Sequence, residues 1–424
     1  MAALSGFRAK TSLSFAHATS CNPCCSLPQV VAVSLLSNCM LVPAVRAAIL
    51  PLLQQQQQQQ EQNAQGLNSL AKLLAPDCHP ALAVKVFGLL SNMCSTAGLR
   101  TALAACQPLV HQVLQSASTA PGEQTGAVVA AMGCLCNLSL EQGVVQQLSA
   151  AGGDTVAHLL QLTAAGSASF QHNCADSIER DSRVAPSAAP KLPPRGKGKS
   201  AGVMPQLQKP VCRAGDIEDC ILSVRAATVL SRVAKQAAGL QQLQSSDALG
   251  VFARAIPECL QAVLSATPPQ HAAQQQQQHQ QPSAEGKEAK KAAVEWLSAA
   301  VRSMALMTAA AEATSSCSPA TATAVIAACC TILRSPVLED SMKGNAALIL
   351  KAFAADDKQQ WHALLAKEDA VEALVTAARA GKGSPSSRNA GIALAVLARA
   401  GGAFIERMRE LRGLEVLYGY VRPA

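Results

Sequence analysis

Apolar residues return along the chain in a pattern of eleven positions, and the pattern has the spacing of a helix. The seventh position is always Leu, the tenth is apolar, and the fourth is small or apolar. Positions four, seven and ten lie on one face of an α-helix, so the pattern predicts helices that bury this face. The copies are VVAVSLLSNCM (30–40), VKVFGLLSNMC (84–94), VAAMGCLCNLS (129–139), VRAATVLSRVA (224–234), GNAALILKAFA (344–354) and RNAGIALAVLA (388–398).

The copies recur at nearly constant intervals. Leu90 and Leu135 are 45 residues apart, and Leu350 and Leu394 are 44 apart. A weaker copy at 298–308 has Met304 and Met307 at the seventh and tenth positions. A second helix follows each copy after a turn marked by Gly or an acid, and we expect Asp369 to cap one of them. A period near 44 residues built from helices predicts an all-α solenoid of stacked repeats. The seventh-position leucines are Leu36, Leu90, Leu135, Leu230, Leu350 and Leu394.

Several short motifs within the copies are similar to those of a known family. LLSN at 35–38 and 89–92 and LCNLS at 135–139 resemble the L-x-N-L-(S/A) core of the third helix of armadillo repeats. AAGG at 150–153 resembles the Gly-marked turn that opens the next repeat. The chain therefore resembles the armadillo-repeat family (ARM/HEAT-like), which implies an armadillo-type α-solenoid, a superhelix of helical repeats.

Three stretches of biased composition interrupt the repeats, and we expect them to be disordered because they contain too few apolar residues to bury. They are a glutamine run, a Pro-rich basic stretch and a second Gln-rich stretch. The predicted organisation is a disordered or targeting-like N-terminus (1–26), a first helical repeat (27–53), a Gln-rich loop (54–66), armadillo repeats (67–175), a Pro/basic insert (176–215), an armadillo repeat (216–266), a Gln-rich insert (267–290) and C-terminal armadillo repeats (291–424).

The resemblance also suggests where a partner binds. In armadillo proteins the Asn of this motif lines the concave groove, and Asn38, Asn92 and Asn137 match it. An amide both donates and accepts hydrogen bonds, so these side chains could bind the backbone of an extended segment. The alternative is that each Asn only caps or bridges neighbouring helices. The later repeats carry Arg232, Ala352 and Val396 at this position, so any ladder of Asn ends midway.

Cations beside the repeat helices bear on the kind of partner. Arg225, Arg232, Lys351 and Arg388 could add a basic strip to the groove, which would favour acidic or phosphorylated partners. The alternative is that they only solvate helix ends. Import adaptors of the family carry Trp four residues before the Asn, but this chain has Ser34, Gly88 and Gly133 there, so we do not expect a receptor for nuclear signals.

Other chemistry finds little support in the sequence. The formal charge of +8 is modest for 424 residues, and the basic stretch 183–213 contains no aromatic residue to stack on bases, so nucleic-acid binding is not favoured. Cys21, Cys24, Cys25 and His17 resemble half a zinc site with no second pair nearby. No motif of a nucleotide-binding, hydrolase or metalloprotease site occurs. We therefore predict a protein without catalytic activity, cofactor or metal, and no membrane span.

The predicted function is a scaffold or adaptor that holds an extended or helical segment of another protein in the concave groove. Two alternatives stay open. The C-terminal RNAGIALAVLA…ERMRELRGLEVLYGYV resembles the armadillo part of tetratricopeptide/armadillo proteins of ciliary dynein-arm assembly, which would imply a co-chaperone-like adaptor. The acid-free N-terminus and the basic stretch instead suit an organellar or nucleic-acid-associated repeat protein. We expect a cytoplasmic location, with organellar import as the alternative.

Overall fold

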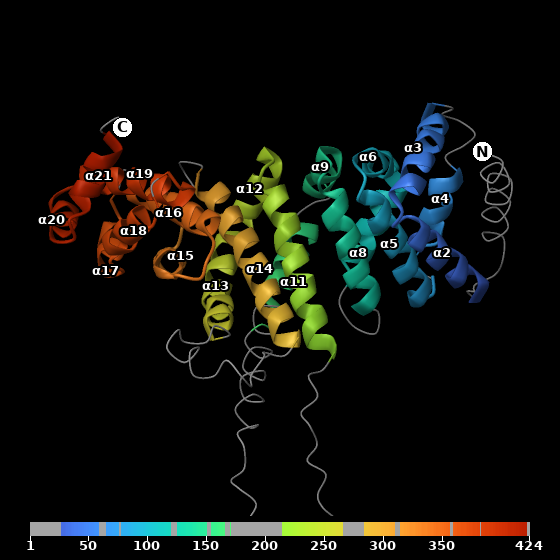
Figure 1. Cartoon of the computed structure of the whole chain (residues 1–424), viewed down its shortest axis with the longest axis horizontal. Coiled ribbons are helices and arrows are strands. Elements are labelled where there is room, and N and C mark those ends of the chain that lie inside the picture. The colour runs from blue at the N-terminus through green and yellow to red at the C-terminus, as the bar shows by residue number, and fades with distance from the viewer. Residues whose placement is uncertain are drawn as a thin grey trace, which may run out of the picture.

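The computed structural model describes most of the chain, and helix is the only regular secondary structure in the part it describes. The helices form one elongated stack with the N-terminal and C-terminal helices at opposite ends (Figure 1). The described residues are 27–58, 65–75, 78–119, 125–150, 154–165, 170, 214–265, 284–309, 314–356, 359–381 and 383–421.

Seven helices, spaced along the whole length of the stack, form a series in which each helix packs against the next. Each contains one copy of the eleven-position pattern, and we call them the ladder helices. They are α2 (Leu27–Cys39), α5 (Pro80–Cys94), α8 (Thr125–Leu138), α11 (Ala214–Val233), α14 (Ala284–Thr308), α16 (Asp340–Ala354) and α19 (Pro385–Ala400).

Two further helices follow every ladder helix but α14, after which the described residues form one. The first of each pair is α3 (Pro43–Gln58), α6 (Ala97–Ala105), α9 (Gln142–Ala150), α12 (Ala237–Ser245), α17 (His362–Lys367) or α20 (Gly402–Glu410). The second is α4 (Gln65–Lys72), α7 (Gln107–Ala117), the helix 154–165, α13 (Ala248–Ser265), α18 (Ala370–Arg379) or α21 (Gly413–Val421). Between α14 and α16 a turn at 314–316 takes the place of the first helix, before α15 (Pro319–Arg334). This succession of helix triads is that of an armadillo-type α-solenoid and confirms the predicted fold class.

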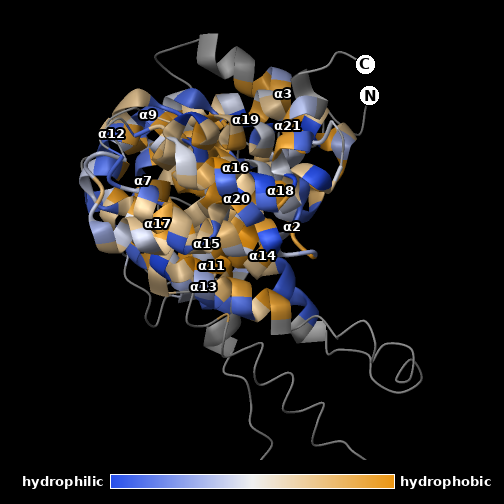
Figure 2. Cartoon of the chain, turned by 90° about the vertical axis from the view of Figure 1, so that its left-hand side faces the viewer, coloured by the Kyte–Doolittle hydropathy of each residue, from blue (hydrophilic) through white to orange (hydrophobic). Residues whose placement is uncertain are grey.

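The leucines of the pattern form the core between the helices. Leu90, Leu230, Leu350 and Leu394 are 0% exposed and Leu135 is 1% exposed, as predicted. Met304 and Met307 of the weaker copy are buried as well. Leu36 is only half-buried, because α2 is the first ladder helix described and packs against a single ladder neighbour, α5. Seen along the stack, hydrophobic residues (orange) gather between the helices (Figure 2).

Local sequence signals set several helix starts. Asp369 is the N-cap of α18, with its carboxylate accepting from the Glu372 backbone N–H at 3.3 Å, which confirms the predicted cap. Asp369 has φ of 48° there, a left-handed conformation that Asp tolerates better than most residues. Ser318 and Ser384 cap α15 and α19, and each is followed by Pro at the first helical position.

The helices extend into all three inserts expected to be disordered, the Pro/basic one only at its end, where α11 begins at Ala214. α3 continues through Gln54–Gln58, and α14 already begins at Ala284. Gln, Ala, Glu and Lys are good helix formers, so these polar segments prolong an anchored helix at little cost. The expectations for 1–26, for the zinc-like group His17, Cys21, Cys24 and Cys25, for most of the inserts and for the turn at 151–153 lie outside the described residues.

Among the described helices, none by itself has the length and apolar composition needed to cross a membrane. The consecutive helices α2 and α3 reach this composition together, but they are bent by 106° at the break between them.

Candidate partner-binding site

Each internal ladder helix leaves one side uncovered. α14 packs against α11 and α16 on its flanks and against α13, which precedes it in the chain. The residues of α14 that remain exposed include Lys291, Glu295 and Arg302, which recur at helical spacing on one side. We call this uncovered side of the ladder helices the open face. It carries Asn92, Asn137 and Arg232, three of the residues predicted to line a groove.

The open face changes in chemistry along the stack. Its fifth and ninth pattern positions are Gly and Asn on α5 and α8, then Thr228 and Arg232 on α11 and Arg302 and Leu306 on α14. On the last two ladder helices the same positions are Leu348, Ala352, Ile392 and Val396, all of them half-buried except Ile392, which is 42% exposed. The face therefore passes from amide through guanidinium to aliphatic side chains.

Side chains at the ninth position connect adjacent ladder helices. Asn92 on α5 donates through Nδ2 to the Ser37 backbone oxygen and to Ser37 Oγ on α2, both at 3.0 Å. Arg232 on α11 donates through Nη1 to the Cys136 backbone oxygen on α8, and to Ser139 Oγ at 2.7 Å. In both cases the acceptor carbonyl is that of the eighth position on the preceding ladder helix.

The second position makes a parallel set of connections. Arg225 on α11 donates through Nη1 to the Val129 backbone oxygen on α8. Asn389 on α19 donates through Nδ2 to the Gly344 backbone oxygen on α16 at 3.1 Å. Gly133 leaves room for the Arg225 guanidinium, because a Cβ at this residue would lie 3.0 Å from Arg225 Nη1. The ladder helices are thus joined by side-chain-to-backbone bonds at two equivalent positions.

These hydrogen bonds bear on whether the predicted site residues bridge neighbouring helices or are free to bind a partner. Both amide hydrogens of Asn92 point to Ser37, so the bridging alternative describes this residue, with Oδ1 left to accept from a partner. Arg232 bridges in the same way. Asn38 is exposed, and Asn137 and Lys351 are half-buried, and within the described residues none of these three makes a side-chain hydrogen bond that would occupy it.

The cations on the open face influence one another. Burial lowers the pKa of Arg232, Cys136 raises it, and the nearby positive charges of Arg100 and Arg302 lower it further. Arg100 forms an ion pair with Glu141, and its Nε lies 2.7 Å from Glu141 Oε1. Burial also lowers the pKa of Arg225. The middle of the solenoid therefore gathers several guanidinium groups from different repeats.

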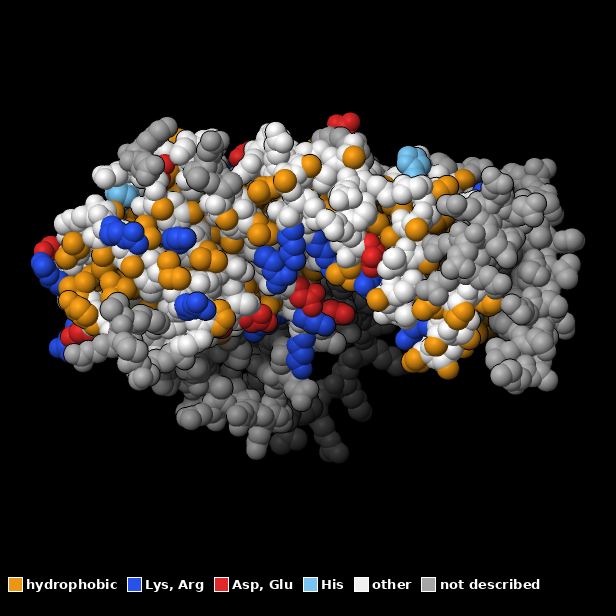
Figure 3. All heavy atoms as spheres, turned by 90° about the horizontal axis from the view of Figure 1, so that it is seen from above, with side chains coloured by type: hydrophobic (Ala, Val, Ile, Leu, Met, Phe, Trp, Pro, Cys, Tyr) orange, Lys and Arg blue, Asp and Glu red, His pale blue; other side chains and the backbone are white. Residues whose placement is uncertain are grey.

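Sequence reasoning did not single out Arg302. A lone exposed Arg on a helix has the same pattern as any solvated residue, and its significance depends on the neighbours that stacking brings to it. Its only sequence signal is the fifth position of the weak copy at 298–308. Figure 3 shows Lys and Arg side chains with several acidic ones gathered in the middle of the molecule.

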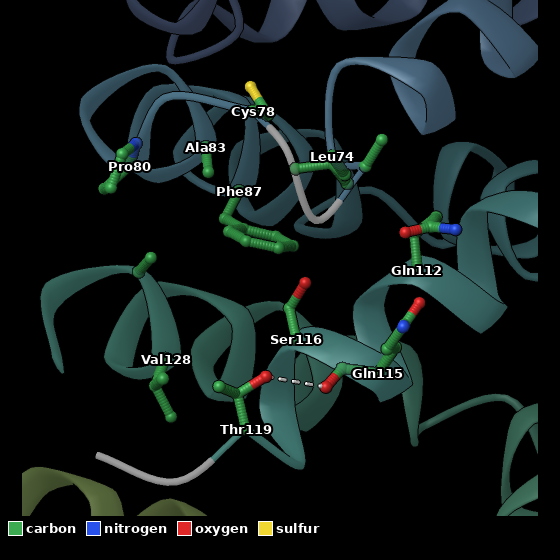
Figure 4. A pocket seen from close by; sticks show the side chains of 12 residues that line it. Leu74, Cys78, Pro80, Ala83, Phe87, Gln112, Gln115, Ser116, Thr119 and Val128 are labelled. Carbon is green, nitrogen blue, oxygen red and sulfur yellow. Dashed lines mark hydrogen bonds between the residues drawn. The ribbon is translucent and has the colours of Figure 1, made fainter. Parts of the chain in front are cut away.

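Two cavities lie away from the open face. The first, about 200 Å³, is bounded by Phe87 of α5, Gln112 and Ser116 of α7 and Val128 of α8, and no charged side chain lines it (Figure 4). It is smaller than a usual ligand pocket. The second, about 360 Å³, lies at the C-terminal end between Leu365 and Phe404, beside the ion pair of Asp369 and Arg407.

Known proteins offer likenesses of structure alone. No known family profile matches the chain, and no curated protein sequence matches it. Two engineered proteins solved by the Northeast Structural Genomics Consortium align with TM-scores of 0.47 and 0.45, each at 13% identity, over 79% of this chain and 98% and 99% of their own. A designed armadillo repeat protein aligns with a TM-score of 0.44 and 14% identity, over 78% of this chain and 99% of its own. The armadillo-type assignment rests on the helix triads described above, and the resemblance to dynein-arm assembly proteins stays a prediction.

Proposed function

We propose that this armadillo-type solenoid is a non-enzymatic scaffold that holds a segment of another protein against the open face of its ladder helices. In a solenoid each repeat contacts only its neighbours, so a continuous surface stays available along the stack. The observation that carries the proposal is the ordered change of this surface from amide to guanidinium to aliphatic side chains. On such a surface the amides can bind the backbone of one segment, the guanidinium groups an anionic side chain of it, and the aliphatic side chains its apolar residues, at successive repeats.

The aliphatic end of the face offers a direct test. Ile392 on the open face and Leu264 on α13 are exposed to nearly the same extent, 42% and 40%. A photo-reactive amino acid introduced in the full chain at position 392 samples the open face, and one at position 264 samples α13, which is not a ladder helix. We expect the probe at position 392 to crosslink one defined protein, and an excess of the unlabelled chain to suppress this adduct. The probe at position 264 should give no such adduct.

Charge substitution at the same pair of residues completes the test. Ile392→Glu is expected to abolish binding of the protein captured from position 392, whereas Leu264→Glu is expected to leave it unchanged. Both variants add one charge at a comparably exposed apolar residue, so general loss of stability affects them alike. Equal binding by the two variants would show that the open face is not the binding surface.

A further inference from the structure

Arg302 has no acidic partner of its own in the part of the chain that the structure describes. It is exposed on the open face of α14, and its guanidinium makes no hydrogen bond or ion pair with a described residue. The two flanking arginines differ from it in this respect. Arg232 donates to α8, and Arg100 is bound to Glu141. A guanidinium free on such a surface has five N–H donors available for an anion.

Two acids in this part of the solenoid already lie beside other cations. Glu295 is seven residues earlier on the same helix, which places it about 10 Å away along the axis. Glu295 Oε1 lies 3.9 Å from Lys291 Nζ, so it already has a cation beside it. Glu141 is held by Arg100. Arg225, Arg232 and Arg302 thus bring three guanidinium groups to the ladder helices at the middle of the stack, and of these three Arg302 is the exposed one, without a described acidic partner.

Aliphatic side chains begin directly beside this charge. Leu306 follows Arg302 by one turn of α14 and is half-buried. The next ladder helix carries Leu348 at the position equivalent to Arg302, and the last carries Ile392. A segment that places an anion on Arg302 can thus place apolar side chains on α16 and α19 without leaving the open face.

We propose that Arg302 binds a carboxylate of an acidic segment whose apolar side chains pack on Leu348, Ile392 and Val396. This inference rests on the proposed function and adds the chemistry of the partner. A carboxylate accepts two parallel hydrogen bonds from a guanidinium. A Leu or Ile of the same segment gains binding free energy when its apolar surface is buried against the aliphatic side chains. The partner is therefore an acidic and aliphatic protein segment.

The experiment uses the purified full chain and short fluorescein-labelled peptides that combine Leu with Glu. Otherwise identical peptides carry Gln, Lys or phosphoserine in place of Glu, and binding is followed by fluorescence anisotropy at two salt concentrations. The variants are Arg302→Glu and the matched charge reversal Arg254→Glu on α13. The Arg254 side chain is 63% exposed, and its contact with Asp247 is an exposed pair at 3.6 Å that contributes little.

We expect the Glu peptide to bind, with a Kd raised about tenfold or more by Arg302→Glu and unchanged by Arg254→Glu. Higher salt should weaken binding of the Glu peptide and leave the Gln peptide unaffected. Each variant replaces an exposed residue, so both are expected to fold, and thermal unfolding checks that they do.

Three results would overturn the assignment. They are equal binding of the Glu and Gln peptides, equal effects of the two reversals, and absence of binding by the Glu peptide. Binding confined to the phosphoserine peptide would assign Arg302 to phosphate and also reject the carboxylate. If Ile392→Glu still abolishes capture in any of these cases, the open face remains the binding surface and only its charge selectivity is wrong.

Discussion

The side-chain amide of Asn389 on α19 donates a hydrogen bond of 3.1 Å to the backbone oxygen of Gly344 on α16. Arg225 makes the same connection from α11 to Val129 on α8. The residues occupy the same two positions of the pattern in repeats far apart in the sequence. The recurrence shows that the α8–α11 and α16–α19 junctions share one register, maintained by these hydrogen bonds as well as by buried leucines.

Replacement of Asn389 tests the contribution of one such connection. Asn389→Ala removes the donor to Gly344 and is expected to lower the free energy of unfolding by about 1 kcal/mol. Asn345 occupies the same pattern position on α16 and makes no such hydrogen bond among the described residues, so Asn345→Ala is the matched control. Chemical unfolding followed by circular dichroism measures both. Equal losses for the two variants would mean that the bond to Gly344 contributes nothing specific.

The cap of α18 predicts a dependence of stability on pH. The hydrogen bond from Arg407 lowers the pKa of Asp369, burial opposes this, and the Glu372 backbone N–H and the charge of Arg334 lower it further. Because the folded pKa lies below the unfolded one, about 3.9, this stabilisation is complete above that value and is lost as the pH falls through the folded pKa. Asp369→Asn keeps a capping side chain that tolerates positive φ but removes the charge.

We therefore expect Asp369→Asn to lower Tm at pH 7 and to have a smaller effect at pH 3. Asp369→Ala also loses the cap, and should cost about 1 kcal/mol more than Asp369→Asn at both pH values. Thermal unfolding monitored by circular dichroism at the two pH values measures this. A Tm difference between the wild type and Asp369→Asn that does not shrink at low pH would contradict the assigned role of the carboxylate.

The thiol of Cys136 should react slowly in the folded chain. Burial raises its pKa to about 11, although Arg232 and Arg225 lower it. The thiolate is the nucleophile, so alkylation by iodoacetamide is expected to rise about tenfold per pH unit between pH 8 and pH 10. Peptide mass spectrometry after timed labelling follows this residue, and the denatured chain is the control, where Cys136 should react as an ordinary thiol. Equal rates in the folded and denatured chain at pH 8 would contradict a raised pKa of this half-buried thiol.

The fold was predictable because its signal is local. Leu90, Leu135, Leu350 and Leu394 were expected in the core, and all are buried, since helical spacing alone places them on the packed face. Asn92 was not resolved between groove and bridge, because its partner Ser37 is 55 residues away in sequence. Arg225 and Val129 are 96 residues apart, so the pattern gave no reason to pair them. The position of Arg302 beside the other arginines and the aliphatic side chains arises only when three repeats stack.

The ladder helices form one continuous stack that includes the junction of α8 and α11, which the chain reaches only after residues 151–213. A protease site introduced between residues 190 and 200 allows the chain to be cut there after folding. At this junction Arg225 and Arg232 of α11 donate hydrogen bonds to backbone oxygens of α8. We predict that the two fragments remain together on size-exclusion chromatography without denaturant, with the helical circular-dichroism signal unchanged. Elution as two separate folded fragments would contradict a single solenoid.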